Sequence, residues 1–113
     1  MPRSDNQYLG EFEQLVLLAV LQLGENARAL DLRRELEEQA NRKVARGALY
    51  ATLERLCTKG FLEWEVEDAT PTRGGLPRRR FTVTSEGVTA LRLSRQAVAN
   101  LSRGLERLLE ESR

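Results

Sequence analysis

The fold is decided by one stretch in the middle of the chain, Val44-Ala-Arg-Gly-Ala-Leu-Tyr50-Ala-Thr-Leu-Glu-Arg-Leu-Cys-Thr-Lys-Gly60-Phe-Leu-Glu-Trp64. Its first part predicts a helix over residues 45–59, because its leucines recur at helical spacing and a glycine is suited to end it. Its last part begins an alternation of apolar and acidic residues over 61–67, which is the period of a strand. A basic helix therefore runs directly into a strand.

A second strand is expected downstream of the first. Phe81 and Val83 alternate with threonines over residues 80–84. The connecting loop, residues 71–80, holds four arginines, two glycines and two prolines, a composition expected at the tip of a hairpin. Helix, strand, basic loop and strand follow one another in this order in a winged helix, which places the helix and the hairpin on the same side of a small domain.

Two further helices are expected before the central one. Residues 9–23 are apolar nearly all round, so this helix must be buried on two sides, and a second subunit is the simplest cover for one of them. Residues 29–40 carry two leucines four positions apart and a strongly charged outer face. The predicted fold class is mostly α with a small β-hairpin, with residues 1–85 forming a winged helix-turn-helix DNA-binding domain.

The last segment, residues 86–113, is expected to form a C-terminal dimerisation helix. Its apolar residues recur at intervals of seven, which indicates a seam against a partner helix. A helix that lies back across its own domain is the alternative, but the apolar surface left uncovered favours a homodimer. The residues expected at the dimer interface are Phe12, Val16, Leu91, Val98, Leu101, Leu105 and Leu108.

Composition narrows the class of protein. With 113 residues, of which 41% are hydrophobic and 31% charged, the chain resembles one globular domain with an added helix. One cysteine and no histidine leave no disulfide and no evident zinc or general-base site. The longest apolar run, Leu15 to Leu21, is too short to span a bilayer. We therefore expect a cytoplasmic protein that needs no cofactor, binds no metal and is not an enzyme.

The formal net charge is only +1, but the charges are unevenly distributed. Residues 42–59 hold five basic residues against one acid, and residues 71–80 hold four arginines and no acid. If folding brings these segments together, they form a cationic surface suited to the phosphates of double-stranded DNA. The alternative is a set of scattered, solvated charges. We favour DNA because the basic segments flank a helix with a small, polar outer face.

The candidate DNA-binding residues come from the approach to the central helix, from its outer face and from the wing. Small side chains would let the helix backbone approach the major groove, and arginines could contact guanine or phosphate. The ring of Tyr50 could be a packing residue, or its hydroxyl could bind a phosphate. The candidates are Arg42, Lys43, Arg46, Gly47, Tyr50, Ala51, Arg55, Arg73, Arg78, Arg79 and Arg80.

Three motifs in this region are similar to those of one known family. They are Gly47-Ala-Leu-Tyr50-Ala-Thr-Leu53-Glu-Arg-Leu56, Lys59-Gly60-Phe-Leu62 and Arg80-Phe-Thr-Val-Thr84-Ser-Glu-Gly87-Val-Thr-Ala-Leu91. In order and spacing they resemble the PadR family of bacterial transcriptional regulators. The resemblance implies a dimeric winged helix-turn-helix repressor of the short branch, which ends in a single dimerisation helix. Ala45 stands where a serine usually caps the recognition helix of the family.

The expected function is a sequence-specific DNA-binding transcriptional regulator, most simply a repressor that acts as a homodimer on a pseudo-palindromic operator. A small-molecule effector of unknown identity is a further candidate partner, and the sequence leaves its existence open. The alternative is a winged-helix protein-interaction module that docks an acidic partner without specific DNA binding. Salt-sensitive and sequence-selective binding to duplex DNA would separate these two functions.

Overall fold

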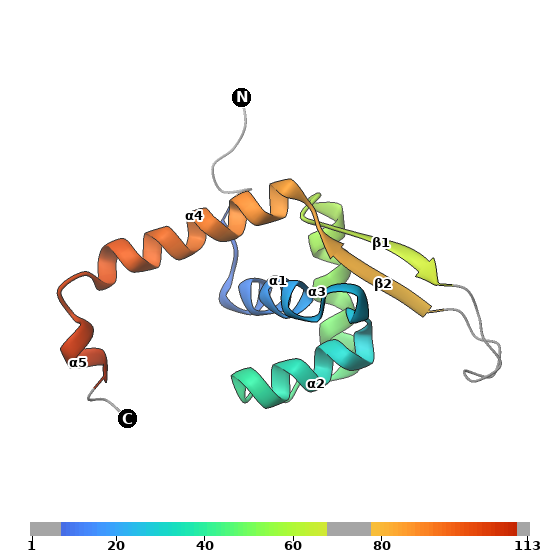
Figure 1. The fold of residues 1–113 in the computed structure, drawn as a ribbon, viewed down its shortest axis with the longest axis horizontal. Helices are drawn as coiled ribbons and strands as arrows, with labels where there is room; N and C mark the ends of the chain where they lie inside the picture. The colour runs from blue at the N-terminus through green and yellow to red at the C-terminus, as the bar shows by residue number, and fades with distance from the viewer. Residues whose placement is uncertain (1–7, 68–77, 111–113) are drawn as a thin grey trace.

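The computed structural model describes residues 8–67 and 78–110, which form a mostly helical fold with one two-stranded hairpin (Figure 1). This architecture confirms the predicted winged helix-turn-helix class with a C-terminal helical segment. In chain order the elements are α1 (Glu11–Leu23), the 3-10 helix η2 (Gly24–Asn26), α2 (Ala29–Ala40), α3 (Arg46–Thr58), β1 (Leu62–Glu67), β2 (Arg78–Val83), α4 (Ser85–Ser102) and α5 (Glu106–Glu110).

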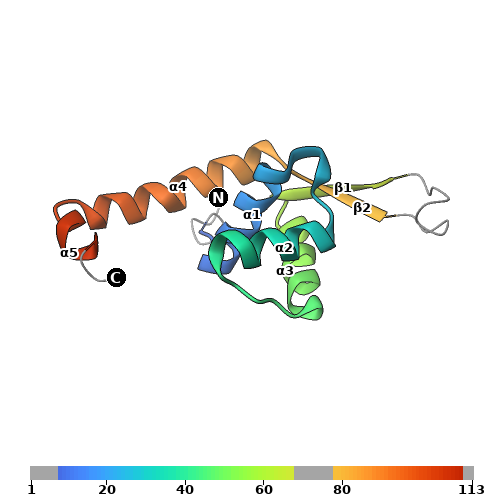
Figure 2. The ribbon, with the colours of Figure 1, turned by 60° about the horizontal axis from the view of Figure 1, so that its bottom comes forward.

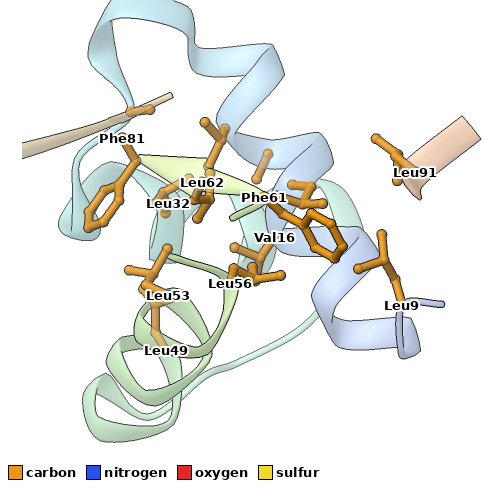
Figure 3. Packing of buried hydrophobic residues seen from close by; sticks show 14 of the residues in the cluster. Leu9, Val16, Leu32, Leu49, Leu53, Leu56, Phe61, Leu62, Phe81 and Leu91 are labelled. Atoms are coloured by element: carbon orange, nitrogen blue, oxygen red, sulfur yellow. The ribbon is translucent and has the colours of Figure 1, made fainter. Parts of the chain in front are cut away.

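The hydrophobic core lies between α1, α2, α3 and the base of the hairpin (Figure 3). α1 contributes Val16 and Leu17, and α3 contributes Leu49, Leu53 and Leu56, each no more than 1% exposed. Burial of a side chain of this size stabilises a fold by roughly 1.5–3 kcal/mol. The leucine stripe that predicts α3 in the sequence is therefore its buried face, and the opposite face of α3 is left exposed.

A tight joint connects α3 to the wing and the wing to α4. Gly60 has a φ of +84°, in the left-handed region that favours glycine, and its N–H donates to the carbonyl of Cys57. The hydroxyl of Thr84 donates to the carbonyl of Gly60 at 2.7 Å and accepts from the N–H of Gly87 at 3.0 Å. A Cβ atom at Gly87 would lie only 2.3 Å from the carbonyl oxygen of Phe61. The two hydrogen bonds of Thr84 and the close approach of Gly87 to Phe61 hold α3, the wing and α4 together.

The wing is an antiparallel pair in which Leu62 lies opposite Val83 and Trp64 lies opposite Phe81. Successive side chains of a strand point to opposite faces, so Leu62, Trp64 and Val66 share one face of the hairpin. Leu62 is buried, whereas Trp64 and Val66 are exposed. The hairpin thus leaves the core after its first residues and extends away from the helical body (Figure 1).

Two contacts hold the wing against the start of α2. The N–H of Phe81 donates to the carbonyl of Ala27 at 2.9 Å. Arg28 donates two hydrogen bonds to the carboxylate of Glu67, at 2.6 and 2.9 Å. These hydrogen bonds from Arg28 hold the pKa of Glu67 below its ordinary value. Both strands of the hairpin are therefore attached to the helical body.

The helix α4 divides into a packed half and an uncovered half. Leu91 and Ser94 are buried against the domain, and the N–H of Leu9 donates to the hydroxyl of Ser94 at 3.3 Å. Residues 95–101 of α4 are exposed, and this end of the helix projects away from the body, in the direction opposite to the wing (Figures 1 and 2). Over residues 8–67 and 78–110, no helix is long and apolar enough to cross a membrane.

The structure corrects the expectation of one unbroken helix after residue 86. The helix α4 ends at Ser102, and α5 begins at Glu106. Gly104, between them, has a φ of +85°, a conformation outside the range of a right-handed helix. The last three residues of the predicted helix, 111–113, lie outside the described residues.

Candidate nucleic-acid interface

The outer face of α3 is exposed and carries small side chains. Gly47, Ala48 and Ala51 are exposed, and a Cβ atom added at Gly47 would meet nothing within 4 Å. The start of this helix lies at an extremity of the body (Figure 2). The major groove of B-DNA is wide enough to admit an α-helix, and small side chains let the helix backbone come close to the base edges. This face therefore has the shape required of a recognition helix.

Cationic side chains surround the start of α3. Lys43 and Arg46 are exposed, and neither pairs with an acid in the part of the chain that the structure describes. The guanidinium of Arg46 lies over Tyr50, with Cζ 5.7 Å from the ring centroid. Tyr50 itself is half-buried and packs against the core. Arg42 differs from its neighbours because it pairs with Glu11 of α1.

Arg55 is held by contacts within the domain. Its Nε donates to Oε2 of Glu13 at 3.1 Å, and its Nη2 donates to the hydroxyl of Thr52 at 3.3 Å. Lys59 donates to the same oxygen of Glu13 at 2.9 Å. Burial acts to raise the pKa of Glu13, but hydrogen bonds from Lys59, the Gly10 N–H and Arg55 outweigh it, and the pKa is lowered. Arg55 therefore helps to place α3 on α1.

The three described wing arginines do not share one face of the hairpin. Arg79 lies on the same face as Trp64, whereas Arg78 and Arg80 lie on the other, because side chains alternate along β2. Arg79 and its two neighbours therefore face different surroundings. Arg73, the fourth candidate in the wing, lies outside the described residues.

Two of the wing arginines contact acids. Arg80 pairs with Glu65 of the neighbouring strand and lies 3.9 Å from Glu67, on the face of the hairpin opposite to Trp64. The Nη1 of Arg79 donates to Oε2 of Glu54 at 2.9 Å, and its Cζ lies 4.2 Å from the centroid of the Trp64 ring. Arg79 thereby bridges the wing to the outer face of α3. This contact was not predicted from the sequence, although Glu54 is the one acid among the cations of residues 42–59.

The residues expected at a dimer interface fall into two groups. Val16 and Leu91 are buried in the core of the chain itself, and Phe12 is half-buried beside them. The second group lies on the projecting C-terminal segment and is exposed, Leu101 most of all at 83%. This group consists of Val98, Leu101, Leu105 and Leu108. Only the second group offers apolar surface that a partner could cover without rearrangement of the core.

Comparisons with known proteins identify the fold. The sequence matches the model of the transcriptional regulator PadR-like family over residues 17–93. A PadR family transcriptional regulator from Eggerthella lenta DSM 2243 is 29% identical, with a TM-score of 0.67 over 88% of this chain and 87% of that chain. A PadR-like transcription factor from Bacteroides fragilis is 26% identical, with a TM-score of 0.68 over 86% of this chain and 88% of that chain.

A third solved structure shares the fold at lower identity. It is a PadR-like transcriptional regulator from Bacillus cereus strain ATCC 14579, 21% identical, with a TM-score of 0.69 over 87% of this chain and 90% of that chain. The comparison with curated protein sequences gives no match.

The family match extends from α1 into α4 and so includes the recognition helix and the wing. It covers well over half of the chain, including the segments that resemble this family in sequence. PadR-like proteins are regulators that act on DNA and in general are not enzymes. The chain therefore belongs to the PadR-like family of transcriptional regulators.

Proposed function

We propose that this protein is a sequence-specific regulator that binds DNA as a homodimer and represses transcription by occupying a pseudo-palindromic operator. The observation that carries the proposal is the exposed face of α3, where Gly47 and Ala51 leave the helix open. Lys43 and Arg46 flank this face, and neither pairs with an acid among the described residues. A helix of this shape suits the major groove, and flanking cations suit the phosphates beside it.

The candidate residues divide into two roles in this proposal. Gly47, Ala51 and Arg46 lie in or at the edge of the major groove, where base edges differ between all four base pairs. Lys43 and the wing arginine Arg78 bind phosphates, which position the protein without reading sequence. Contacts of this second kind release counterions, so affinity should fall steeply as salt concentration rises.

The homodimer is supported by the apolar surface of the C-terminal segment. Val98, Leu101, Leu105 and Leu108 are exposed on α4 and α5, beyond the point where α4 leaves its own domain. Patches of exposed leucine on a projecting helix are usually covered by a partner. We therefore assign residues 86–113 to dimerisation and residues 1–85 to DNA binding. We assign no residues to a small-molecule effector.

A symmetric dimer makes a geometric prediction about the operator. Two winged helices related by a two-fold axis bind two inverted half-sites, whose centres lie about one helical turn apart, roughly 10–10.5 base pairs. Repression follows if such a site overlaps a promoter, because the bound dimer occupies the DNA that the polymerase needs.

Selection from a random pool of duplex DNA, repeated at low and moderate salt, tests the proposal. Enrichment of an inverted repeat, with binding that weakens steeply at the higher salt, is the expected result. Salt-sensitive binding without enrichment would reject sequence-specific regulation. Absence of binding at both salt concentrations would favour the protein-interaction module, in which an acidic partner binds the cationic face instead of DNA.

A further inference from the structure

An acidic residue lies on the face of α3 that the proposed function turns toward DNA. Glu54 follows Gly47 and Ala51 by seven and three positions, so the three residues line one side of the helix. Its side chain is 59% exposed. A carboxylate in this place repels phosphates, which weakens binding to every duplex equally unless the carboxylate itself contacts a base.

The partner of Glu54 is an arginine that would otherwise be available to DNA. Glu54 accepts a hydrogen bond from Arg79 of the wing at 2.9 Å, while the guanidinium of Arg79 lies over the ring of Trp64. The contact joins the recognition helix to the wing, the two elements that hold DNA in the proposal. Because Glu54 and Arg79 are both largely exposed, the pair is weak and can exchange for other partners.

DNA offers a better partner to each member of this pair. A phosphate oxygen can accept from the guanidinium of Arg79. In the major groove, the N4 amino group of cytosine donates a hydrogen bond, and glutamate is the side chain suited to accept it. The move of Arg79 to a phosphate is coupled to the move of Glu54 to a base. When Arg79 leaves, the carboxylate of Glu54 is unpaired unless a base amine replaces the arginine.

We propose that Glu54 is a specificity-determining residue that accepts a hydrogen bond from cytosine N4 in the operator and thereby releases Arg79 to a phosphate. On unrelated DNA, Glu54 keeps Arg79 paired, so that Arg79 adds nothing to non-specific affinity. The proposal rests on the proposed function, because it requires α3 to lie in the major groove. A purely structural pair, which only holds the wing against α3, would affect all duplexes alike.

The test compares Glu54→Gln with the matched control Glu65→Gln. Glu65 is 61% exposed and also pairs with a wing arginine, Arg80, but on the face of the hairpin away from Trp64. Both substitutions remove one negative charge at similar exposure. The affinity of each protein is measured for the selected operator duplex and for a random duplex of equal length, over a series of salt concentrations.

For Glu54→Gln we expect tighter binding to the random duplex, with a steeper salt dependence by about 0.9 in the slope, because Arg79 now neutralises one more phosphate. The ratio of operator to random affinity should fall at least about fivefold, the discrimination that one base pair supplies. Selection with this variant should show a weaker preference for one cytosine in each half-site, because the neutral amide oxygen of glutamine is a poorer acceptor than a carboxylate. Glu65→Gln should leave the ratio and the selected sequence unchanged.

Two results would overturn the inference while leaving the proposed function intact. One is an unchanged operator preference in Glu54→Gln when the wild type has a clear one. The other is an equal loss of preference in Glu65→Gln, which would make the effect one of charge alone. A wild-type protein that selects no sequence would instead reject the proposed function, and the inference with it. Unfolding curves of both variants show whether the domain is intact in each comparison.

Discussion

At the scale of single residues, a few polar contacts hold α3 against distant parts of the chain. Glu13 of α1 accepts from Arg55 and Lys59 of the α3 end and from the Gly10 N–H. A buried carboxylate with these partners is satisfied, but each partner loses an acceptor if the carboxylate is removed. Glu13 therefore joins α1 to the C-terminal end of α3.

We predict that Glu13→Gln lowers the free energy of unfolding by about 1–3 kcal/mol at neutral pH, because charge-assisted hydrogen bonds are lost in a buried site. The folded pKa of Glu13 is lowered from 4.5, so its contribution is complete above pH 4.5 and is lost as pH falls through the folded pKa. The difference from wild type in urea unfolding should therefore shrink at acidic pH. Glu11→Gln, at an exposed ion pair, is the control. An equal effect of both substitutions would contradict a special role of Glu13 in stability.

Two helical glycines should respond in opposite directions to alanine. At Gly87 a Cβ atom would meet the carbonyl oxygen of Phe61 at 2.3 Å, so Gly87→Ala should destabilise the fold by at least about 2 kcal/mol. At Gly47 a Cβ atom meets nothing within 4 Å, so Gly47→Ala should stabilise α3 by up to about 1 kcal/mol. Thermal or urea unfolding of the two variants measures both effects. A stable Gly87→Ala protein would show that the joint between wing and α4 is looser than described.

At the scale of elements, the sequence predicts much of the fold because its periodicities are strong. The bounds of α1, α2, α3 and both strands lie within two residues of those that the apolar patterns predict. The break at Gly104 was not predicted, because Gly47 and Gly87 are compatible with helix and nothing local marks Gly104 as different. The alternation of β2 was predicted, but its consequence for the wing arginines was not.

The start of α3 lacks a side-chain cap. Ala45, the N-cap residue, has an extended backbone and no side chain that can accept from the first turn. We predict that Ala45→Ser stabilises the domain by about 1 kcal/mol, since a serine hydroxyl can accept from an unpaired N–H of α3. Ala51→Ser, in the middle of the same helix, should instead cost a few tenths of a kcal/mol because serine is a poorer helix former than alanine. Equal effects in urea unfolding would argue against a capping mechanism.

At the scale of the whole molecule, the charge pattern of the sequence predicts a cationic surface but not its pairing. The contacts of Arg55 with Glu13 and of Arg79 with Glu54 join residues 42 and 25 positions apart, so they depend on packing that local patterns do not reveal. For the same reason, the sequence did not separate Val16 and Leu91, which belong to the core, from the exposed leucines of the C-terminal segment.

The exposed leucines lead to a prediction about assembly. Leu101→Glu should convert the proposed dimer into a monomer, because it introduces an unpaired charge where the partner helix would pack. Leu30→Glu is the matched control, since Leu30 is also exposed but lies on α2, away from the C-terminal segment. Sedimentation equilibrium measures the molecular mass of both variants. A dimeric Leu101→Glu protein would place the subunit contact elsewhere.

The most direct test of dimeric, sequence-specific DNA binding is the effect of half-site spacing on affinity. The wild-type protein is titrated against the selected inverted repeat and against the same duplex with half a helical turn, about 5 base pairs, inserted between the half-sites. We predict that the insertion weakens binding by at least about tenfold, because the two α3 helices of a fixed dimer cannot then reach both half-sites. Equal affinity for the two duplexes would contradict it, since each half-site would then be bound by an independent subunit.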